Sequence, residues 1–185
     1  MTTGGGPHLY RGAAAVLGSL ALLFVGFLVV GFLLPSGWDA ERSVRITAVP
    51  DSVFPHLSHA ERWGEWTPSP ATGVELFGPS DGPGSGRRWD DPLYGKGEFV
   101  IAASTPPRAV SYEVQVDEGA IQIRGELRLE PEGDGTMVRW REEGDFGWNP
   151  LLGYLARRMN ELQGAQMEAS LLALKQLTEG PGLTP

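Results

Sequence analysis

The stretch NPLLGYLARRMNELQGAQMEASLLALKQLT, residues 149–178, decides the fold of this 185-residue chain. Asn149 is a residue type that caps the first turn of a helix, and Pro150 is tolerated there because its missing N–H would have no partner. The Glu-Gly-Pro sequence at 179–181 is a helix stop. Between these signals, mostly apolar residues recur at three- and four-residue steps: Leu155, Met159, Leu162, Gln166, Ser170, Leu174 and Leu177. The pattern predicts one long C-terminal helix, which needs a broad apolar surface to lie on.

The charge balance and the absence of cysteine exclude several classes of partner and site. Asp and Glu outnumber Lys and Arg by 23 to 15, which argues against nucleic acid, whose phosphates require a basic surface. The same balance disfavours binding to anionic lipid through charge alone. The sequence has no cysteine, so disulfides, thiolate metal sites and a cysteine nucleophile are excluded.

Residues 12–34 form an uncharged, strongly apolar segment. At ~1.5 Å per residue this segment spans roughly 35 Å as a helix, enough to cross a hydrocarbon core of about 30 Å. The alternative is a cleaved signal peptide, but its apolar region runs only ~7–15 residues before a small-x-small site. The sequence around Leu33 to Trp38 is a poor cleavage site. We therefore predict a disordered tail over 1–11, a single-pass transmembrane helix over 12–34 and a linker over 35–40.

The flanking charges suggest an orientation for this helix. Arg11 precedes the span, and positive charge on a short N-terminal flank favours a cytoplasmic N-terminus. The contrast is weakened by Arg42 and Arg45, which follow the span. The expectation is an extracytoplasmic soluble domain, with Trp38 as an aromatic anchor at the membrane interface.

Residues 41–179 are expected to form one α+β domain, followed by a disordered tail over 180–185. Two short helical segments follow the first strand, and Pro55 is expected to shorten or kink the first of them. Strands that are apolar on one face and charged on the other predict an antiparallel sheet with one covered face, and the C-terminal helix supplies the cover. The period-two stretches are 41–49, 74–77, 87–89, 94–104, 110–116, 121–130 and 136–141.

Short local motifs agree with this order of elements. They are AVPDSVF at 48–54, WGEWTP at 63–68, PPRAVSY at 106–112, GELRLEP at 125–131 and GTMVRW at 135–140. In this order they resemble the START-like or SRPBCC superfamily, and most of all its polyketide cyclase/dehydrase-like branch. The resemblance implies a helix-grip fold, in which a curved antiparallel sheet of about seven strands wraps around a long C-terminal helix. Members include lipid carriers, small-ligand binders and cyclases, so fold is implied more firmly than function.

The resemblance also implies a ligand cavity between the sheet and the long helix. The alternative is that the inward side chains only fill a core, as regular aromatic and aliphatic stripes usually do. The inward-facing candidates for ligand binding are Trp89, Phe99, Tyr112, Val114, Ile123, Leu127, Val138, Trp140, Leu155, Met159 and Leu162.

Few polar residues are candidates for catalysis. Glu142 continues the inward phase of its strand, so it can be a buried carboxyl with a raised pKa, and Tyr112 can donate a hydrogen bond to a carbonyl. Alternatively, Glu142 faces solvent or pairs with Arg88 or Arg141, and Tyr112 is a core tyrosine that reaches the surface. His56 and His59 lack a third ligand, so neither a metal nor another cofactor is predicted.

Two further features are assigned to the surface. The basic pairs Arg87-Arg88 and Arg157-Arg158 are expected to be solvated, and the glycine-rich loop at 79–86 is expected to be a mobile flap. The sequence thus predicts a membrane-anchored domain that binds a hydrophobic small molecule or lipid. The alternatives are a cyclase- or hydratase-like enzyme that uses Glu142 and Tyr112, and a protein-interaction domain with a filled core.

Overall fold

The sheet contains every predicted strand. The computed structural model describes residues 7–180 except 71, 148 and 157. Within them, seven strands form one antiparallel sheet in the order β1-β7-β6-β5-β4-β3-β2. The first strand therefore pairs with the last, and all other neighbours are consecutive. The strands are β1 (Gly37–Ile46), β2 (Glu75–Phe77), β3 (Gly86–Asp91), β4 (Gly95–Thr105), β5 (Ala109–Val116), β6 (Ile121–Glu132) and β7 (Gly135–Asp145).

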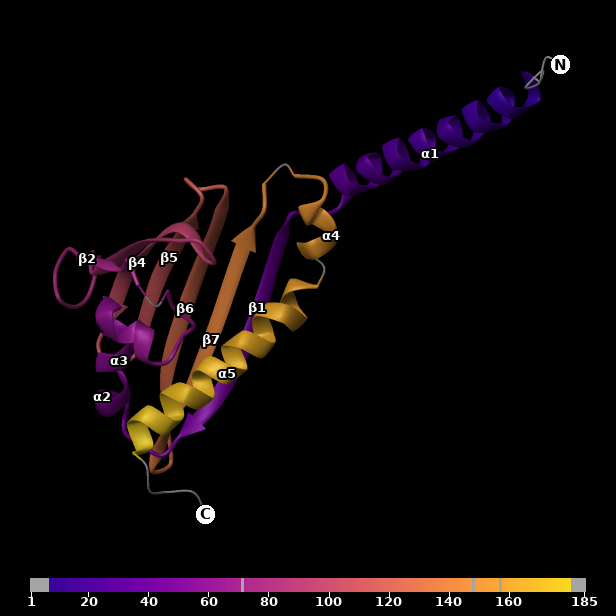
Figure 1. Cartoon of the computed structure of the whole chain (residues 1–185). Helices are drawn as coiled ribbons and strands as arrows, with labels where there is room; N and C mark the ends of the chain where they lie inside the picture. The colour runs from indigo at the N-terminus through magenta and orange to yellow at the C-terminus, as the bar shows by residue number, and fades with distance from the viewer. Residues whose placement is uncertain (1–6, 71, 148, 157, 181–185) are drawn as a thin grey trace.

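Helices cover the inner face of this sheet, which confirms the α+β helix-grip fold (Figure 1). The long C-terminal helix α5 lies across β1 and β7, while the short helices after β1 lie toward the other edge. Pro55 separates two single-turn helices, as predicted. The helices are α1 (Pro7–Leu33), α2 (Pro50–Val53), α3 (Pro55–Ser58), the 3₁₀ helix η1 (Ala60–Glu65), α4 (Leu152–Ala156) and α5 (Met159–Glu179).

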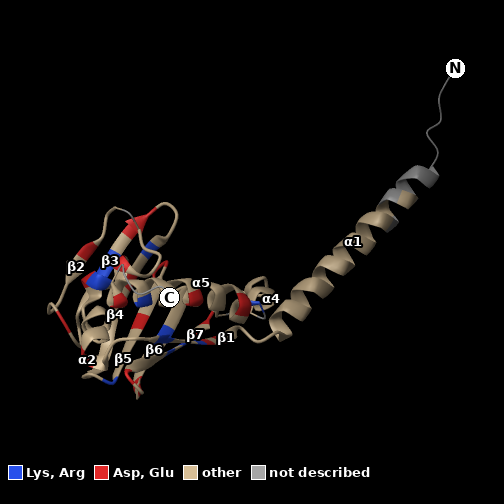
Figure 2. Cartoon of the chain, turned by 90° about the horizontal axis from the view of Figure 1, so that it is seen from below, with Lys and Arg blue, Asp and Glu red and all other residues tan. Residues whose placement is uncertain are grey.

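The apolar helix α1 projects away from the domain. It begins at Pro7, earlier than the predicted residue 12, while residues 1–6 of the predicted tail lie outside the described residues. Figure 2 shows acidic and basic residues on the domain, and residues 12–33 of α1 contain none, although Arg11 lies near the start of the helix. The stretch Val16–Leu33 is long and apolar enough to cross a membrane, and 6% of it is buried.

The first strand begins earlier than predicted. β1 starts at Gly37 rather than at residue 41, which removes most of the predicted linker over 35–40. The cause is tertiary packing of Trp38, which is 7% exposed. Its ring covers Gly144 and lies 6.3 Å from the ring centroid of Phe146. Trp38 is thus a core residue, and its assignment as an interfacial anchor was wrong.

The prediction of one continuous C-terminal helix was also wrong. α4 ends at Ala156 and α5 begins at Met159, with a tighter turn between them in which Arg158 N–H donates to Leu155 O at 2.8 Å. This turn interrupts the helix, and only Ser170 and Leu174 of the predicted stripe are fully buried on α5. Leu162, Gln166 and Leu177 are exposed. The buried face is formed by Gly164, Met167, Ser170, Leu171 and Leu174.

An inward-facing arginine holds the first half of α5 on the sheet. Arg42 of β1 pairs through Nε with Glu168 Oε1 at 2.6 Å and donates from Nη2 to Asn160 O at 3.1 Å. Gly164 makes this possible, because a Cβ there would come within 2.0 Å of Arg42 Nη2.

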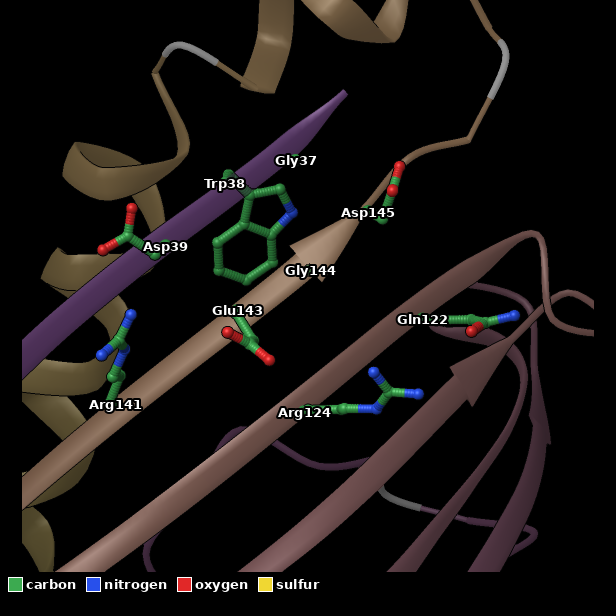
Figure 3. A pocket seen from close by; sticks show the side chains of 9 residues that line it. All are labelled: Gly37, Trp38, Asp39, Gln122, Arg124, Arg141, Glu143, Gly144 and Asp145. Atoms are coloured by element: carbon green, nitrogen blue, oxygen red, sulfur yellow. The ribbon is translucent and has the colours of Figure 1, made fainter. Parts of the chain in front are cut away.

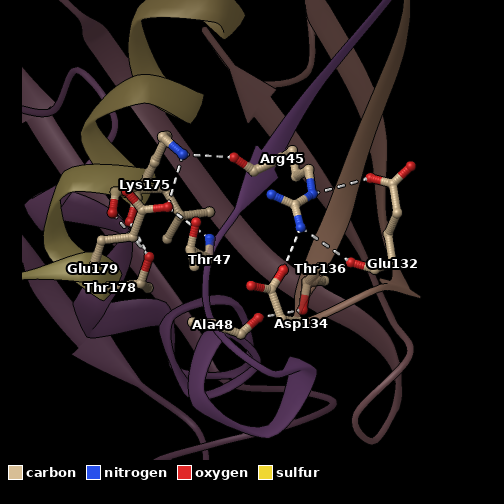
Figure 4. Close-up of polar contacts among 10 residues, drawn as sticks. Arg45, Thr47, Ala48, Glu132, Asp134, Thr136, Lys175, Thr178 and Glu179 are labelled. Carbon is tan, nitrogen blue, oxygen red and sulfur yellow. Dashed lines mark hydrogen bonds and ion pairs between the residues drawn. The ribbon is translucent and has the colours of Figure 1, made fainter. Parts of the chain in front are cut away.

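The other end of α5 is held by the hydrogen bonds in Figure 4. Lys175 Nζ donates to Arg45 O at 2.8 Å, and Glu179 Oε1 accepts from the Thr47 N–H at 2.6 Å. Gly180 then ends the helix with a φ of 75°, which confirms the predicted stop. The position of α5 over β1 is therefore fixed at both ends.

Candidate functional site

An aromatic cluster fills the space between the sheet and η1. Trp63 lies at the centre, with its ring centroid 4.7 Å from that of Trp66, 4.5 Å from Phe99 and 4.6 Å from Tyr112. Trp140 lies 5.5 Å from Trp66. All five side chains are buried. This half of the domain is a packed core, and Phe99 and Trp140 belong to it.

A buried hydrogen-bond network lies where this cluster meets α5. Tyr112 OH donates to Glu142 Oε1 and accepts from Trp140 Nε1 at 2.8 Å. On the other side, Gln163 Nε2 of α5 donates to Glu142 Oε2 at 2.6 Å. The ring of Tyr112 occupies the space over Gly125, where a Cβ would come within 2.2 Å of the ring. Both catalytic candidates from the sequence thus meet in one network.

The electrostatics of this network follow from burial. Glu142 is 5% exposed, so it neither faces solvent nor pairs with Arg88 or Arg141. Burial raises the pKa of Glu142, and the hydrogen bonds from Tyr112 and Gln163 oppose part of that rise. Burial and the neighbouring carboxyl raise the pKa of Tyr112 well above its usual value. The phenol therefore remains a neutral donor at physiological pH.

Half-buried apolar side chains lie beside the network. Val114 and Ile123 are cross-strand partners on β5 and β6. Val114 is two residues from Tyr112 and Ile123 is two residues from Gly125, so all four lie on the same face of the sheet. Met159 precedes Gln163 by one turn on α5, so these two side chains share a helix face. We call Val114, Ile123, Met159 and Gln163 the inner wall. Its side chains are half-buried, so this part of the domain retains access from outside.

The predicted ligand-binding set is therefore divided. Leu127 and Val138 are fully buried core residues, as are the aromatic residues described above. Trp89 is half-buried and covers Gly97 at the far edge of the sheet. Leu155 and Leu162 are 37% and 56% exposed because of the break before α5. Val114, Ile123 and Met159 remain beside the buried carboxyl, and Gln163 is the member that sequence reasoning missed.

The surface hollows among the described residues include five of 290–520 Å³ that are not lined by α5. The hollow in Figure 3, of about 450 Å³, lies at the ends of β1, β6 and β7. It combines Arg124 and Arg141 with the carboxylates of Asp39, Glu143 and Asp145. Exposed charges of both signs do not suit an apolar ligand, so this hollow is not a candidate site for one.

The glycine-rich loop is bound to the domain. Gly82 N–H donates to Ser58 O and Gly84 N–H donates to Ile101 O, both at 2.8 Å. Ser85 is buried, and its Oγ accepts from the Ala60 N–H at 3.2 Å. These bonds connect the loop to α3, η1 and β4, so its assignment as a mobile flap was wrong.

The end of α1 is joined to α4. Tyr154 OH donates to Phe27 O at 2.7 Å, and the two rings stack with centroids 4.5 Å apart. Gly31 allows the close approach, because a Cβ there would lie 2.2 Å from Pro150 O. A hollow of about 290 Å³ lies along this junction. Since Phe27 precedes Leu33 by six residues, α4 meets α1 about 9 Å before the end of the apolar span.

Comparisons with known proteins agree with the fold. Protein CV1439 from Chromobacterium violaceum is 16% identical, with a TM-score of 0.57 over 77% of this chain and 97% of that one. The Aha1 dimer from Colwellia psychrerythraea is 17% identical, with a TM-score of 0.54 over 78% and 98%. The di-domain ARO/CYC StfQ from the steffimycin biosynthetic pathway is 15% identical, with a TM-score of 0.60 over 77% and 51%.

A search of curated proteins finds no significant match. The sequence profile of the family described as polyketide cyclase / dehydrase and lipid transport matches residues 37–179, which include the whole sheet and α5. The chain therefore belongs to the polyketide cyclase/dehydrase and lipid transport family, within the SRPBCC superfamily.

Proposed function

We propose that this protein is a membrane-anchored ligand-binding protein that takes up a hydrophobic small molecule or lipid between the sheet and α5. The observation that carries the proposal is the buried Glu142 at the inner wall, with Gln163 and Tyr112 bonded to it. Apolar side chains beside a small number of fixed polar groups are the usual composition of a small-molecule site. Family membership supports ligand binding in general.

Gln163 determines how a ligand would be oriented. Its side chain is half-buried and connects the buried carboxyl of Glu142 to the accessible inner wall. A hydroxyl or carbonyl group of the ligand would bond at Gln163, while its apolar part would contact Val114, Ile123 and Met159. Binding would require small movements of the wall, since side chains already occupy much of the space.

The Glu142–Tyr112 pair also supports an enzymatic alternative, a cyclase- or hydratase-like reaction. A carboxyl with a raised pKa can exchange a proton near neutral pH, and a neutral phenol can donate to a developing oxyanion. In the resting state, both carboxyl oxygens already accept hydrogen bonds. An apolar substrate converted at full rate by Glu142→Gln would exclude this version.

We further propose that α1 is the membrane anchor and that the domain lies on the extracytoplasmic side. The length and exposure of Val16–Leu33 support the anchor, and Arg11 before the span supports the orientation. Because Tyr154 meets α1 at Phe27, within the span, α4 would enter the outer part of the same leaflet. The exposed side chains of Leu151 and Leu155 would then contact lipid.

Native mass spectrometry of the full-length protein in mild detergent tests the ligand proposal. We expect a co-purified apolar molecule in the wild type and its loss in Val114→Trp, which fills the inner wall. Leu172→Trp is the matched control, because Leu172 is 53% exposed on α5 and lies away from the wall. A wild type that carries no ligand and takes up no added lipid would instead favour the filled-core interaction domain. If Val114→Trp and Leu172→Trp carried the same amount of the co-purified molecule, that molecule would be lipid bound around α1 and not a ligand of the inner wall.

A further inference from the structure

Arg87 of β3 is a buried cation without a carboxylate partner. The sequence placed it on the surface, but the residue is 7% exposed and points to the same face as Phe99, its cross-strand partner. Its guanidinium lies 5.4 Å from the Phe99 ring centroid. Its neighbour Arg88 is exposed and pairs with Glu98 at 3.3 Å. No such ion pair is formed by Arg87 with any residue that the structure describes.

Only part of the guanidinium has hydrogen-bond acceptors. Nη1 donates to Ser69 Oγ at 2.9 Å and Nη2 donates to Thr67 Oγ1 at 3.5 Å, whereas Nε has no acceptor among the described residues. An arginine carries five N–H donors, so more than half of its capacity is unused. Burial lowers the pKa of Arg87 to about 10, and the group therefore remains charged at neutral pH. A buried charge without a counter-charge is costly and favours binding of an anion.

The surroundings of Arg87 form a site with two chemically distinct sides. A hollow of about 520 Å³ opens between η1, β2 and the loop that joins them. Its polar side contains Arg87, Thr67 and Ser69, and its apolar side contains Val74 and Leu76, which are 40% and 50% exposed. Thr67 Oγ1 donates to Trp63 O at 2.6 Å, so it accepts from Arg87, while the Ser69 hydroxyl can donate to a ligand.

Two residues at the opening refine the ligand class. Gly64 borders the guanidinium, because a Cβ there would be in van der Waals contact with Arg87 Nη1 at 3.5 Å and Ser69 Oγ at 3.8 Å, and a larger side chain would cover the cation. Glu61 also lines the hollow, and its negative charge disfavours a doubly charged phosphate more than a singly charged group. The second proton on each of Nη1 and Nη2 suits the two oxygens of a carboxylate.

We propose that this hollow binds the carboxylate of a small amphipathic acid, with its apolar part against Val74 and Leu76. The site is distinct from the inner wall, because the Phe99 ring lies between Arg87 and Tyr112 of the Glu142 network. Binding would supply the counter-charge that the fold does not, and it would connect the loop after η1 to β2 and β3.

Saturation-transfer NMR on the full-length protein in nanodiscs tests this proposal, with butanoate as the probe and 1-butanol as its uncharged counterpart. We expect saturable butanoate binding at least about tenfold tighter than that of butanol, the factor that a single charge-assisted contact provides. Inorganic phosphate should bind more weakly than butanoate. Glu61→Gln should tighten butanoate binding by about two- to fivefold, because it removes a nearby like charge.

Three variants identify the site. Arg87→Met keeps an unbranched side chain and should lose butanoate binding, while Arg88→Met, one residue away and exposed, should keep it. Gly64→Val leaves the cation in place but closes the approach to it, so it should also lose binding even if Arg87→Met does not fold. Butanoate binding no tighter than that of butanol, or unchanged in Arg87→Met or Gly64→Val, would overturn the proposal.

Discussion

At the scale of single residues, Glu142 makes the stability of the protein depend on pH. Because burial raises the pKa of Glu142, the folded state binds a proton more tightly than the unfolded state does. The stability associated with this group is therefore fully present below the unfolded pKa and is lost as pH rises through the folded pKa. Glu142→Gln removes this titration and keeps the acceptor for Tyr112. We expect its melting temperature to exceed that of the wild type most near pH 8.

The prediction is tested by measuring the melting temperatures of the wild type and of Glu142→Gln across a range of pH. Other groups titrate alike in both, so the difference in melting temperature isolates Glu142. The difference in melting temperature between Glu142→Gln and the wild type should shrink as the pH falls to about 4.5, where an unfolded glutamate becomes half-protonated. A difference that stayed constant, or that grew toward acid pH, would show that Glu142 is not destabilised in its charged form.

The Tyr112 hydroxyl is predicted to stabilise the fold through two partners. Tyr112→Phe keeps the ring over Gly125 but leaves Trp140 Nε1 without its acceptor and Glu142 Oε1 without its donor. We expect a loss of about 1–3 kcal/mol in the free energy of unfolding, the usual cost of an unsatisfied buried group. Urea denaturation measures this loss. Tyr94→Phe, at a position that is 38% exposed, should change the value by no more than about 0.5 kcal/mol.

Strand periodicity gave the inward phase to three members of this network. Alternation along a strand assigns Tyr112, Trp140 and Glu142 to the inner face, although solvent exposure was left open for Glu142. Gln163 was missed because its position depends on the phase of α5, and that phase depends on a break which no glycine or proline marks. Arg87 was assigned to solvent from its charge alone, although its strand phase is the same as that of the half-buried Trp89.

At the scale of elements, the buried face of α5 decides which leucines matter for stability. Leu174 is 0% exposed, whereas Leu172 on the same helix is 53% exposed. Leu174→Ala should lower the free energy of unfolding by about 2–5 kcal/mol, through lost apolar burial and the cavity that remains. Leu172→Ala should change it by about 0.5 kcal/mol or less. Similar losses in denaturant titrations of the two variants would mean that α5 lies on the sheet in a different phase.

The elements differed in how far the sequence could predict them. Strands β4 to β7 and the break at Pro55 followed from local patterns, because alternation and proline act within a few residues. The early start of β1 did not, since Trp38 joins the strand through contacts with Gly144 and Phe146, more than 100 positions away. The division between α4 and α5 has a similar cause: Tyr154 and Gly153 contact α1, while α5 follows β1.

At the scale of the whole molecule, the junction between α1 and α4 orients the domain relative to the proposed membrane. Tyr154, Pro150 and Gly153 all meet α1 between Phe27 and Gly31, so the end of α1 cannot turn freely against the domain. The start of α5, with Met159 and Gln163, follows α4 directly. A ligand drawn from the leaflet would therefore meet the inner wall over a short path, and a soluble relative without α1 would lack this advantage.

The absence of native cysteine allows this arrangement to be measured directly. Single cysteines at Leu23, Leu155 and Leu172, labelled with the environment-sensitive dye NBD, report on α1, α4 and the outer face of α5 in liposomes. All three leucines are exposed, so labels there should leave the core intact. We expect blue-shifted emission and quenching by acyl-chain nitroxide lipids at Leu23 and Leu155, because α4 meets α1 within the apolar span. The label at Leu172 should behave as in water.

The pattern of quenching separates the two parts of the proposal. An unquenched label at Leu23 would rule out α1 as a membrane anchor. Quenching at Leu23 without quenching at Leu155 would keep the anchor and exclude α4 from the leaflet. Gly31→Val provides an internal check, because its side chain would collide with Pro150 O and separate α4 from α1. In that background the label at Leu155 should lose its quenching while the label at Leu23 retains it, since α1 spans the bilayer whether or not α4 is bound to it.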